Sequence, residues 1–312
     1  MAVNFRLVLF QFFFLSVGLC WSVEGKHPIT FADLLSLGRV SDPQISPDGT
    51  WVAYTITRYD REKNAGDSDV WLVPISGGSA RQLTRSEKRD NNPRWSPDGK
   101  KIAFISNRQG GPQIWLQEVS GGEPRKLTSI STGTDGVIWS PDGANLAFTS
   151  DVYPDCKDDA CNKKRDEDAE ASKVKAKVFD RLLYRHWDSW KDGKRTHIFI
   201  TPVSGGQPRD VTPGDYDAPP FSLGGPTDYD FSPDGKELCF ARNTDKVEAT
   251  STNVDLWVVP TGGGVPRKIT NNPAYDGSPL YSPDGKYIAY RAQKRPGFES
   301  DRFELMLYDR SS

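Results

Sequence analysis

The chain has 312 residues, of which 36% are hydrophobic and 26% are charged, so it can bury a substantial core. Lys and Arg number 40 against 42 Asp and Glu, which gives a formal net charge of −2. This balance offers no basic surface for nucleic acid or for an acidic membrane, and we expect neither as a partner.

The first 25 residues differ from the rest. Arg6 precedes a short apolar run that ends near Leu19, and small residues follow it. This pattern predicts a signal peptide over residues 1–25, with the mature chain beginning between Val23 and Lys26, and hence a secreted or periplasmic protein with no membrane contact after cleavage. The alternative is an uncleaved anchor, for which the run is short.

The tetrapeptide Ser-Pro-Asp-Gly occurs five times between residues 46 and 285. It suits a type I turn, because proline presets φ at the second position and glycine tolerates a left-handed fourth position. A strand-like stretch such as "KIAFIS" follows each copy. Each copy therefore predicts a hairpin turn, with structural roles for Asp48, Gly49, Asp98, Gly99, Asp142, Gly143, Asp234, Gly235, Asp284 and Gly285.

A Gly-Gly turn alternates with these copies, at residues 77–78, 121–122, 205–206 and 262–263. An apolar run precedes each turn, and a short strand follows it and ends at Thr84, Thr128, Thr212 or Thr270. Four strands at a period of about 45 residues are typical of a propeller blade. The sequence thus predicts an all-β fold, a β-propeller with four complete four-stranded blades and one partial blade, over residues 26–312.

The third repeat carries an insertion at residues 151–194. Val174, Val178 and Leu182 recur every four residues, which predicts an amphipathic helix around Val174 to Leu183, with acidic residues 166–168 in its first turn. The crossing from residue 212 to 232 is also long, and strand counting places both irregular segments on one face. In repeat proteins the face that carries insertions is often the binding face. The alternative is that both segments only cap the repeat.

The cysteines fit an exported protein. Cys156 and Cys161 lie in a polar stretch of the insertion, and we expect them to close a small disulfide loop in an oxidising compartment. Cys239 lies in a strand and is expected to be a buried apolar residue. The cysteines and histidines are not spaced as zinc ligands, and no phosphate-binding loop is present, so we predict neither a metal site nor a cofactor.

The repeats, such as "WSPDGKKIAFISNRQGGPQIWLQEVSGGEPRKLT" at residues 95–128, resemble TolB-like propellers and the N-terminal propeller of prolyl oligopeptidase-type serine peptidases. Residues 29–56 and 181–200 are similar to the acylaminoacyl-peptidase and dipeptidyl peptidase V branch of that family. The resemblance implies a seven- or eight-bladed propeller before a C-terminal α/β-hydrolase domain. That domain would hold a Ser, Asp and His triad and would remove short peptides from the N-terminus of peptides.

The sequence departs from this plan because it contains no G-x-S-x-G nucleophile elbow. His27, His186 and His197 each lie in a context that favours a structural or solvated role, so we predict no catalytic residue and no activity of the chain alone. Our main hypothesis is a non-catalytic, substrate-gating propeller of an exported peptidase, which would meet peptide substrates through a hydrolase domain missing from this chain. The alternative is a free-standing TolB-like propeller that binds another protein.

The partial fifth blade affects how well the propeller can close into a ring. A five-repeat propeller closes poorly, which leaves blade edges open to water, and open edges recruit other chains. We therefore expect the chain to self-associate.

Overall fold

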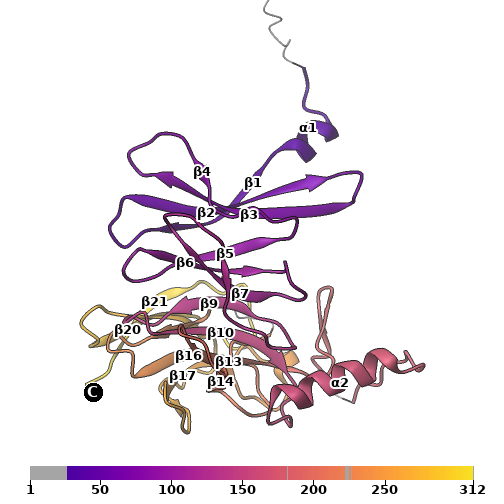
Figure 1. Ribbon diagram of the computed structural model, residues 1–312. Helices are drawn as coiled ribbons and strands as arrows, with labels where there is room; N and C mark the ends of the chain where they lie inside the picture. Colours follow the sequence, from indigo (N-terminus) through magenta and orange to yellow (C-terminus); the bar gives the residue numbers. More distant parts are fainter. Residues whose placement is uncertain (1–26, 181, 222–224, 226, 312) are drawn as a thin grey trace, which may run out of the picture.

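Small β-sheets follow one another along the chain in the computed structural model, which describes residues 27–180, 182–221, 225 and 227–311 (Figure 1). The predicted signal peptide falls on residues outside this part. A short helix, α1 (Phe31–Ser36), comes first, and Thr30 and Asp33 cap its N-terminus reciprocally. Each of the five larger sheets is one blade.

The first two blades are regular antiparallel sheets. Blade 1 comprises β1 (Arg39–Ile45), β2 (Trp51–Asp60), β3 (Ala65–Pro74) and β4 (Arg81–Gln82). Blade 2 comprises β5 (Asp90–Trp95), β6 (Lys101–Ser106), β7 (Gln113–Glu118) and β8 (Arg125–Lys126).

The third blade carries the insertion between its second and third strands. Blade 3 comprises β9 (Asp135–Trp139), β10 (Asn145–Val152), β13 (Arg195–Pro202) and β14 (Arg209–Asp210), and the insertion holds α2 (Asp159–Ala171), β11 (Arg185–His186) and β12 (Ser189–Trp190). Blade 4 comprises β15 (Tyr229–Phe231), β16 (Glu237–Asn243), the 3-10 helix η1 (Glu248–Thr250), β17 (Val254–Pro260) and β18 (Arg267–Lys268). Blade 5 has three strands in the described residues, β19 (Asp276–Tyr281), β20 (Tyr287–Ala292) and β21 (Glu304–Asp309). The predicted propeller fold, with four complete blades, one partial blade and a helical insertion, is confirmed.

The Ser-Pro-Asp-Gly segments form the hairpin turns that the sequence predicts. In every copy the glycine N–H donates to the serine carbonyl at 2.8 to 2.9 Å. The glycine adopts φ between 68° and 71°, where other residues are strained. The serine hydroxyl donates a hydrogen bond to the aspartate carboxylate at 2.5 to 2.7 Å. This side-chain hydrogen bond stabilises the turn.

A threonine follows the fourth strand of each complete blade, and its side chain adds one hydrogen bond to the sheet. The fourth strands are only two residues long, shorter than the sequence suggests. Beyond them the threonine Oγ1 accepts a hydrogen bond from a third-strand N–H at 2.8 to 3.0 Å; the threonines are Thr84, Thr128, Thr212 and Thr270. The hydroxyl thus replaces a backbone carbonyl that a longer strand would supply.

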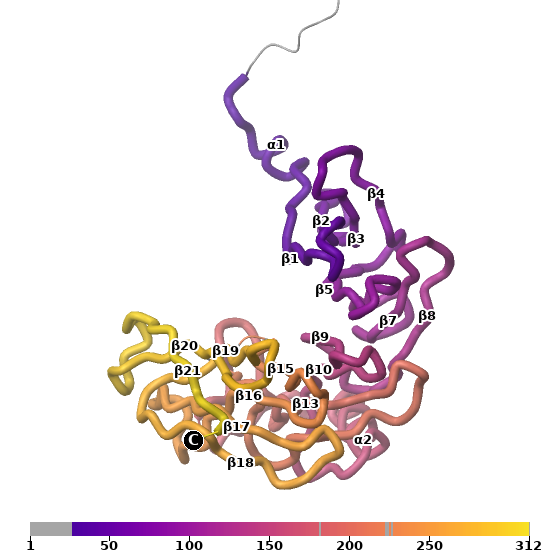
Figure 2. Tube along the Cα trace, turned by 90° about the vertical axis from the view of Figure 1, so that its left-hand side faces the viewer, coloured from indigo at the N-terminus to yellow at the C-terminus, as the bar shows by residue number. Residues whose placement is uncertain are grey.

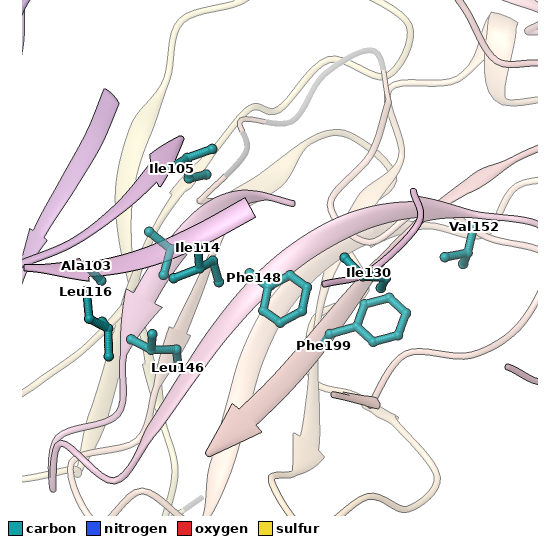
Figure 3. Packing of buried hydrophobic residues seen from close by; sticks show 10 residues of the cluster. Ala103, Ile105, Ile114, Leu116, Ile130, Leu146, Phe148, Val152 and Phe199 are labelled. Carbon is teal, nitrogen blue, oxygen red and sulfur yellow. The ribbon is translucent and has the colours of Figure 1, made fainter. Parts of the chain in front are cut away.

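The hydrophobic core is divided among the spaces between neighbouring blades. Between blades 2 and 3, Ile114 and Leu116 of β7 lie in one cluster with Leu146 and Phe148 of β10 (Figure 3). Similar clusters join the other neighbouring pairs. Figure 2 shows that the blades follow an open arc, with blade 1 and blade 5 at its two ends.

The predicted helix around Val174 to Leu183 is wrong. The helix of the insertion is α2, which begins earlier, where Asp158 caps the N–H of Cys161 at 2.8 Å, and ends at Ala171. Acidic residues 166–168 consequently lie in its last two turns. The apolar residues that suggested a helix are in non-helical chain, because no neighbouring surface covers them: Val174 is 72% exposed and Val178 is 94% exposed.

Candidate functional face

The two faces of the arc are built from different kinds of connection. Because strands alternate in direction, the tight turns share one face, and the loops between second and third strands share the other with the crossings between blades. We call the second the insertion face; it includes residues 60–65, 84–90, 107–112, 151–180, 182–194, 212–221 and 243–253. Figure 1 shows α1 above blade 1, at one end of the arc, and α2 extending from blade 3 at the lower right.

The insertion is fixed at its start to the end of β10. Asn162 on α2 is buried, and its Oδ1 accepts a hydrogen bond from the N–H of Tyr153 at 2.8 Å. The sulfur atoms of Cys156 and Cys161 are bonded to each other, with the Cα atoms 5.5 Å apart. Asp159 accepts hydrogen bonds from the crossing between blades 2 and 3. These contacts set the direction in which α2 leaves the sheet.

The second half of the insertion presents aromatic rings. Phe179, Tyr184 and Trp190 stack with ring centroids 4.4 to 6.1 Å apart, and the Nζ of Lys177 lies 4.8 Å above the Trp190 ring. Trp187, in the turn between β11 and β12, is 83% exposed. Exposed aromatic groups of this kind are enriched where proteins bind peptides or other proteins.

A buried ionic network ties the insertion to the rest of this face. The Arg195 guanidinium donates to Asp215 at 2.7 Å, to Asp217 at 3.0 Å and to Glu248 at 2.8 Å. Lys191 contacts the same Asp217 carboxylate and lies 3.5 Å from Glu248. Burial alone would lower the pKa of Arg195, but the surrounding carboxylates hold it above the usual value.

This network joins three segments that are distant in sequence: the insertion, the crossing into blade 4 and the loop that holds η1. Two cations and three carboxylates in a mostly buried position restrict the geometry more than they add stability. The two irregular segments of the sequence lie on one face, as strand counting predicts, and the structure adds that they contact each other there. His186 also packs edge-on against Phe221 of the crossing, with ring centroids 5.9 Å apart.

Three hollows of the described surface lie on the insertion face. A groove of about 680 Å³ runs between Tyr153, the end of α2, Phe179 and Lys194. A second hollow of about 610 Å³ lies beside α1, and a third of about 310 Å³ lies where blade 3 meets the crossing. The groove beside α2, at about 680 Å³, is within the size range of sites that bind small ligands or short peptides.

The opposite face carries the turn residues that the sequence identifies. The five Asp-Gly pairs lie in five separate turns, so the structure does not bring them together into a site. In each turn the serine hydroxyl donates to the aspartate, and this bond is the main reason that the pKa of the carboxyl is lowered. Their role is structural.

The three histidines have different surroundings. His197 is buried in blade 3, with Nδ1 2.7 Å from Asp210 and Nε2 2.8 Å from the carbonyl oxygen of Gly214. His27 lies near Asp33 before α1, and His186 belongs to the insertion. Across the described ranges, no group of three or more His, Cys, Asp or Glu side chains is arranged to hold a metal ion. No helix in the same ranges is both long and apolar enough to cross a membrane.

The ionic network could not be predicted from the sequence. Its residues are spread from position 191 to 248, and ordinary charged residues at such spacing carry no recognisable pattern. The one available signal was the concentration of acids in the long crossing, at Asp215 and Asp217. Only the packing of the crossing on the insertion identifies their partners.

Comparison with known proteins agrees with the arrangement of blades. The family model of the Tricorn protease N-terminal beta propeller domain matches residues 64–158. Dipeptidyl-peptidase 5 of Porphyromonas gingivalis is 34% identical over 292 residues, which cover 91% of this chain and 42% of the relative. Dipeptidyl-peptidase 5 of Porphyromonas endodontalis is 29% identical, over 88% of this chain and 40% of the relative. The chain thus spans about two-fifths of the length of these curated relatives.

Solved structures show the same fold. Pyrococcus horikoshii acylaminoacyl peptidase superposes with a TM-score of 0.64 at 17% sequence identity, over 88% of this chain and 39% of that chain. The β-propeller domain of the Trilobed protease from Pyrococcus furiosus, whose structure has an open velcro topology, gives a TM-score of 0.53 at 15% identity, over 88% of this chain and 69% of that one.

Proposed function

Since this chain is homologous to the propeller portion of dipeptidyl and acylaminoacyl peptidases, we propose that it acts as the non-catalytic propeller of such a peptidase. In this role its insertion face meets the catalytic domain and limits which peptides reach the active site.

The observation that carries the proposal is the concentration of features on one face. The groove of about 680 Å³, the stacked rings and the exposed Trp187 are all on the insertion face. The opposite face is made of short turns. A surface that only capped the repeat would not need a buried ionic network to hold its insertion in one orientation.

The side chains of the insertion face are suited to contact peptides on their way to an active site. Apolar rings and aliphatic side chains offer contact area to a peptide or to a domain surface, and Lys177, which also meets Asp192, lies among them. The 312 residues contain no nucleophile elbow, so the face can select and orient a peptide but cannot activate a nucleophile. Bond cleavage would belong to the catalytic domain.

Export is part of the same proposal. A peptidase that degrades peptides outside the cytoplasm needs a signal for secretion, and the apolar run before Leu19 supplies that signal. We expect the secreted protein to begin between Val23 and Lys26, and N-terminal sequencing that returns Met1 would contradict this.

A chimera tests the gating role. In dipeptidyl-peptidase 5 of Porphyromonas gingivalis, the matched region is replaced by residues 27–312 of this chain, and the cleavage of short and long peptides is measured. We expect the chimera to cleave short peptides and to discriminate against long ones. The double substitution Val178→Ala and Trp187→Ala should change this discrimination several-fold, since both side chains are exposed on the insertion face.

The matched control is Ile75→Ala with Val265→Ala, two exposed apolar residues beside the tight turns of the opposite face. These substitutions should leave the ratio of rates on short and long peptides unchanged. If both pairs of substitutions have equal effects, or neither has any, the insertion face does not gate. An active chimera that cleaves all lengths equally would also contradict the proposal.

A further inference from the structure

The chain between α2 and β11 runs along the groove beside α2. Every residue from 174 to 180 lines this groove, which has a volume of about 680 Å³. A helix turns only one stripe of its side chains toward a neighbouring hollow, and a strand that packs through one face turns every second side chain. Because consecutive residues line the groove together, the backbone itself forms this wall.

The backbone of this wall has few hydrogen bonds. The N–H of Val174 donates to the hydroxyl of Ser172 at 3.1 Å. From residue 175 to residue 179, no backbone N–H or C=O has a hydrogen-bond partner within the part of the chain that the structure describes. Residues 173–180 are all exposed. A row of unpaired backbone groups beside a hollow is what the open edge of a β-sheet presents.

The side chains of this wall alternate as they do in a strand. Residues 173–178 read "KVKAKV", in which lysine alternates with a small apolar residue. The lysines contact other parts of the insertion, because the Nζ of Lys175 lies 2.8 Å from the carbonyl oxygen of Glu170 and Lys177 forms an ion pair with Asp192. These contacts hold the side chains and leave the main chain available.

The remainder of the groove offers contacts to the side chains of an added strand. Phe179 and Tyr184 line it, and their rings stack with centroids 4.4 Å apart. Lys194 also lines the groove, but it is already paired with Asp166 at 2.8 Å. The groove is therefore suited to a ligand that offers main-chain groups and apolar side chains, rather than to one that offers a single charge.

We propose that this groove binds an extended peptide as an added β-strand along residues 174–179. Main-chain hydrogen bonds hold the peptide, and its apolar side chains pack on Phe179 and Tyr184. Recognition through the main chain tolerates many sequences. The groove is built only from residues 153–195, inside the third repeat. The inference rests on the proposed function for the source of the peptide, a substrate of the peptidase, whereas binding is a property of this chain.

Fluorescence anisotropy tests the binding. The full chain, as secreted, is titrated up to about 300 μM into a fluorescein-labelled, end-blocked peptide in which threonine and valine alternate. We expect saturable binding. Two analogues carry backbone N-methyl groups, one at the threonines and one at the valines. Only one of these two sets faces a partner strand, so one analogue should bind at least about 10-fold more weakly and the other within about twofold of the parent peptide.

Proline substitutions test the same contact from the side of the protein. Lys175→Pro and Ala176→Pro each remove one backbone N–H, at neighbouring positions that point in opposite directions along a strand. One of the two variants should bind the peptide at least about 5-fold more weakly, and the other should bind nearly as the wild type does. Lys175→Ala is the control for loss of the side chain and should leave binding unchanged. Circular dichroism establishes that each variant is folded.

The inference is overturned if the peptide does not bind. It is also overturned if the two analogues, or the two folded proline variants, bind equally, because docking through side chains has no such alternation. This failure is distinct from a failure of gating. Alternating effects on binding, together with a chimera that does not discriminate by length, would remove the gating role and leave the peptide site. A chimera that discriminates, without alternating effects, would remove only the added strand.

Discussion

Replacing Asp230 with asparagine should raise the stability of the chain near neutral pH. Asp230 in β15 is largely buried between blades 4 and 5, and its Oδ2 accepts a hydrogen bond from the N–H of Tyr281 at 2.8 Å. Burial raises the pKa of this carboxyl to about 6, although the backbone N–H groups of Tyr281 and Phe231 oppose the shift. Asparagine keeps an oxygen acceptor at the same place and removes the charge.

The size of the effect follows from the two pKa values. The pKa rises from 3.8 to about 6 on folding, and one pKa unit corresponds to about 1.4 kcal/mol. Because the folded state binds the proton more tightly, this contribution to stability is fully present below pH 3.8 and is lost as the pH rises through 6. We therefore expect the free energy of unfolding of the wild-type chain to lose up to about 3 kcal/mol from this group between acid and neutral pH.

Urea unfolding of both proteins, followed by circular dichroism at several pH values from about 3.5 to 8, measures this difference. The Asp230→Asn variant should be more stable than the wild type near pH 7.5, by about 1 to 3 kcal/mol. The difference should disappear near pH 4, where the wild-type carboxyl is protonated. A variant that is less stable by a constant amount at every pH would refute the reasoning, because the charge would then carry no cost.

Three further outcomes are expected. The purified chain should not hydrolyse dipeptidyl or acylaminoacyl chromogenic substrates, and activity that survives removal of contaminating peptidases would contradict this. Thr128→Val should cost about 2 kcal/mol in urea unfolding, because the buried N–H of Ile114 loses its acceptor, whereas Thr128→Ser should cost less than about 1 kcal/mol. Asp217→Asn should speed limited proteolysis within the insertion, since Arg195 loses its most buried charged partner, and Asp48→Asn on the opposite face should not.

The repeat could be predicted from the amino-acid sequence because its turns are local. Ser-Pro-Asp-Gly closes a hairpin through contacts among neighbouring residues, such as the hydroxyl of Ser46 with the carboxylate of Asp48, and the left-handed glycine needs no distant partner. Each such turn joins two antiparallel strands of one blade. The number of blades and the position of the insertion could therefore be predicted from spacing alone.

The helix of the insertion shows where local pattern fails. A four-residue recurrence of Val174, Val178 and Leu182 predicts an apolar stripe, but a stripe forms a stable helix only where a surface covers it. The chain instead places the helix at Asp159–Ala171, where Asp158 provides a cap and Asn162 provides an anchor. The sequence contains both residues but does not show that β10 ends beside them.

Which distant groups contact each other depends on how the segments pack. Lys191 and Arg195 contact Asp217 and Glu248 because the crossing and the η1 loop fold over the insertion. A charge pair at long sequence separation produces no periodic pattern in the sequence. The same holds for Leu305, which is an unremarkable strand residue by sequence. Its exposure depends on whether another blade lies beside it, and burial is a property of neighbouring sheets, which only the arrangement of the arc decides.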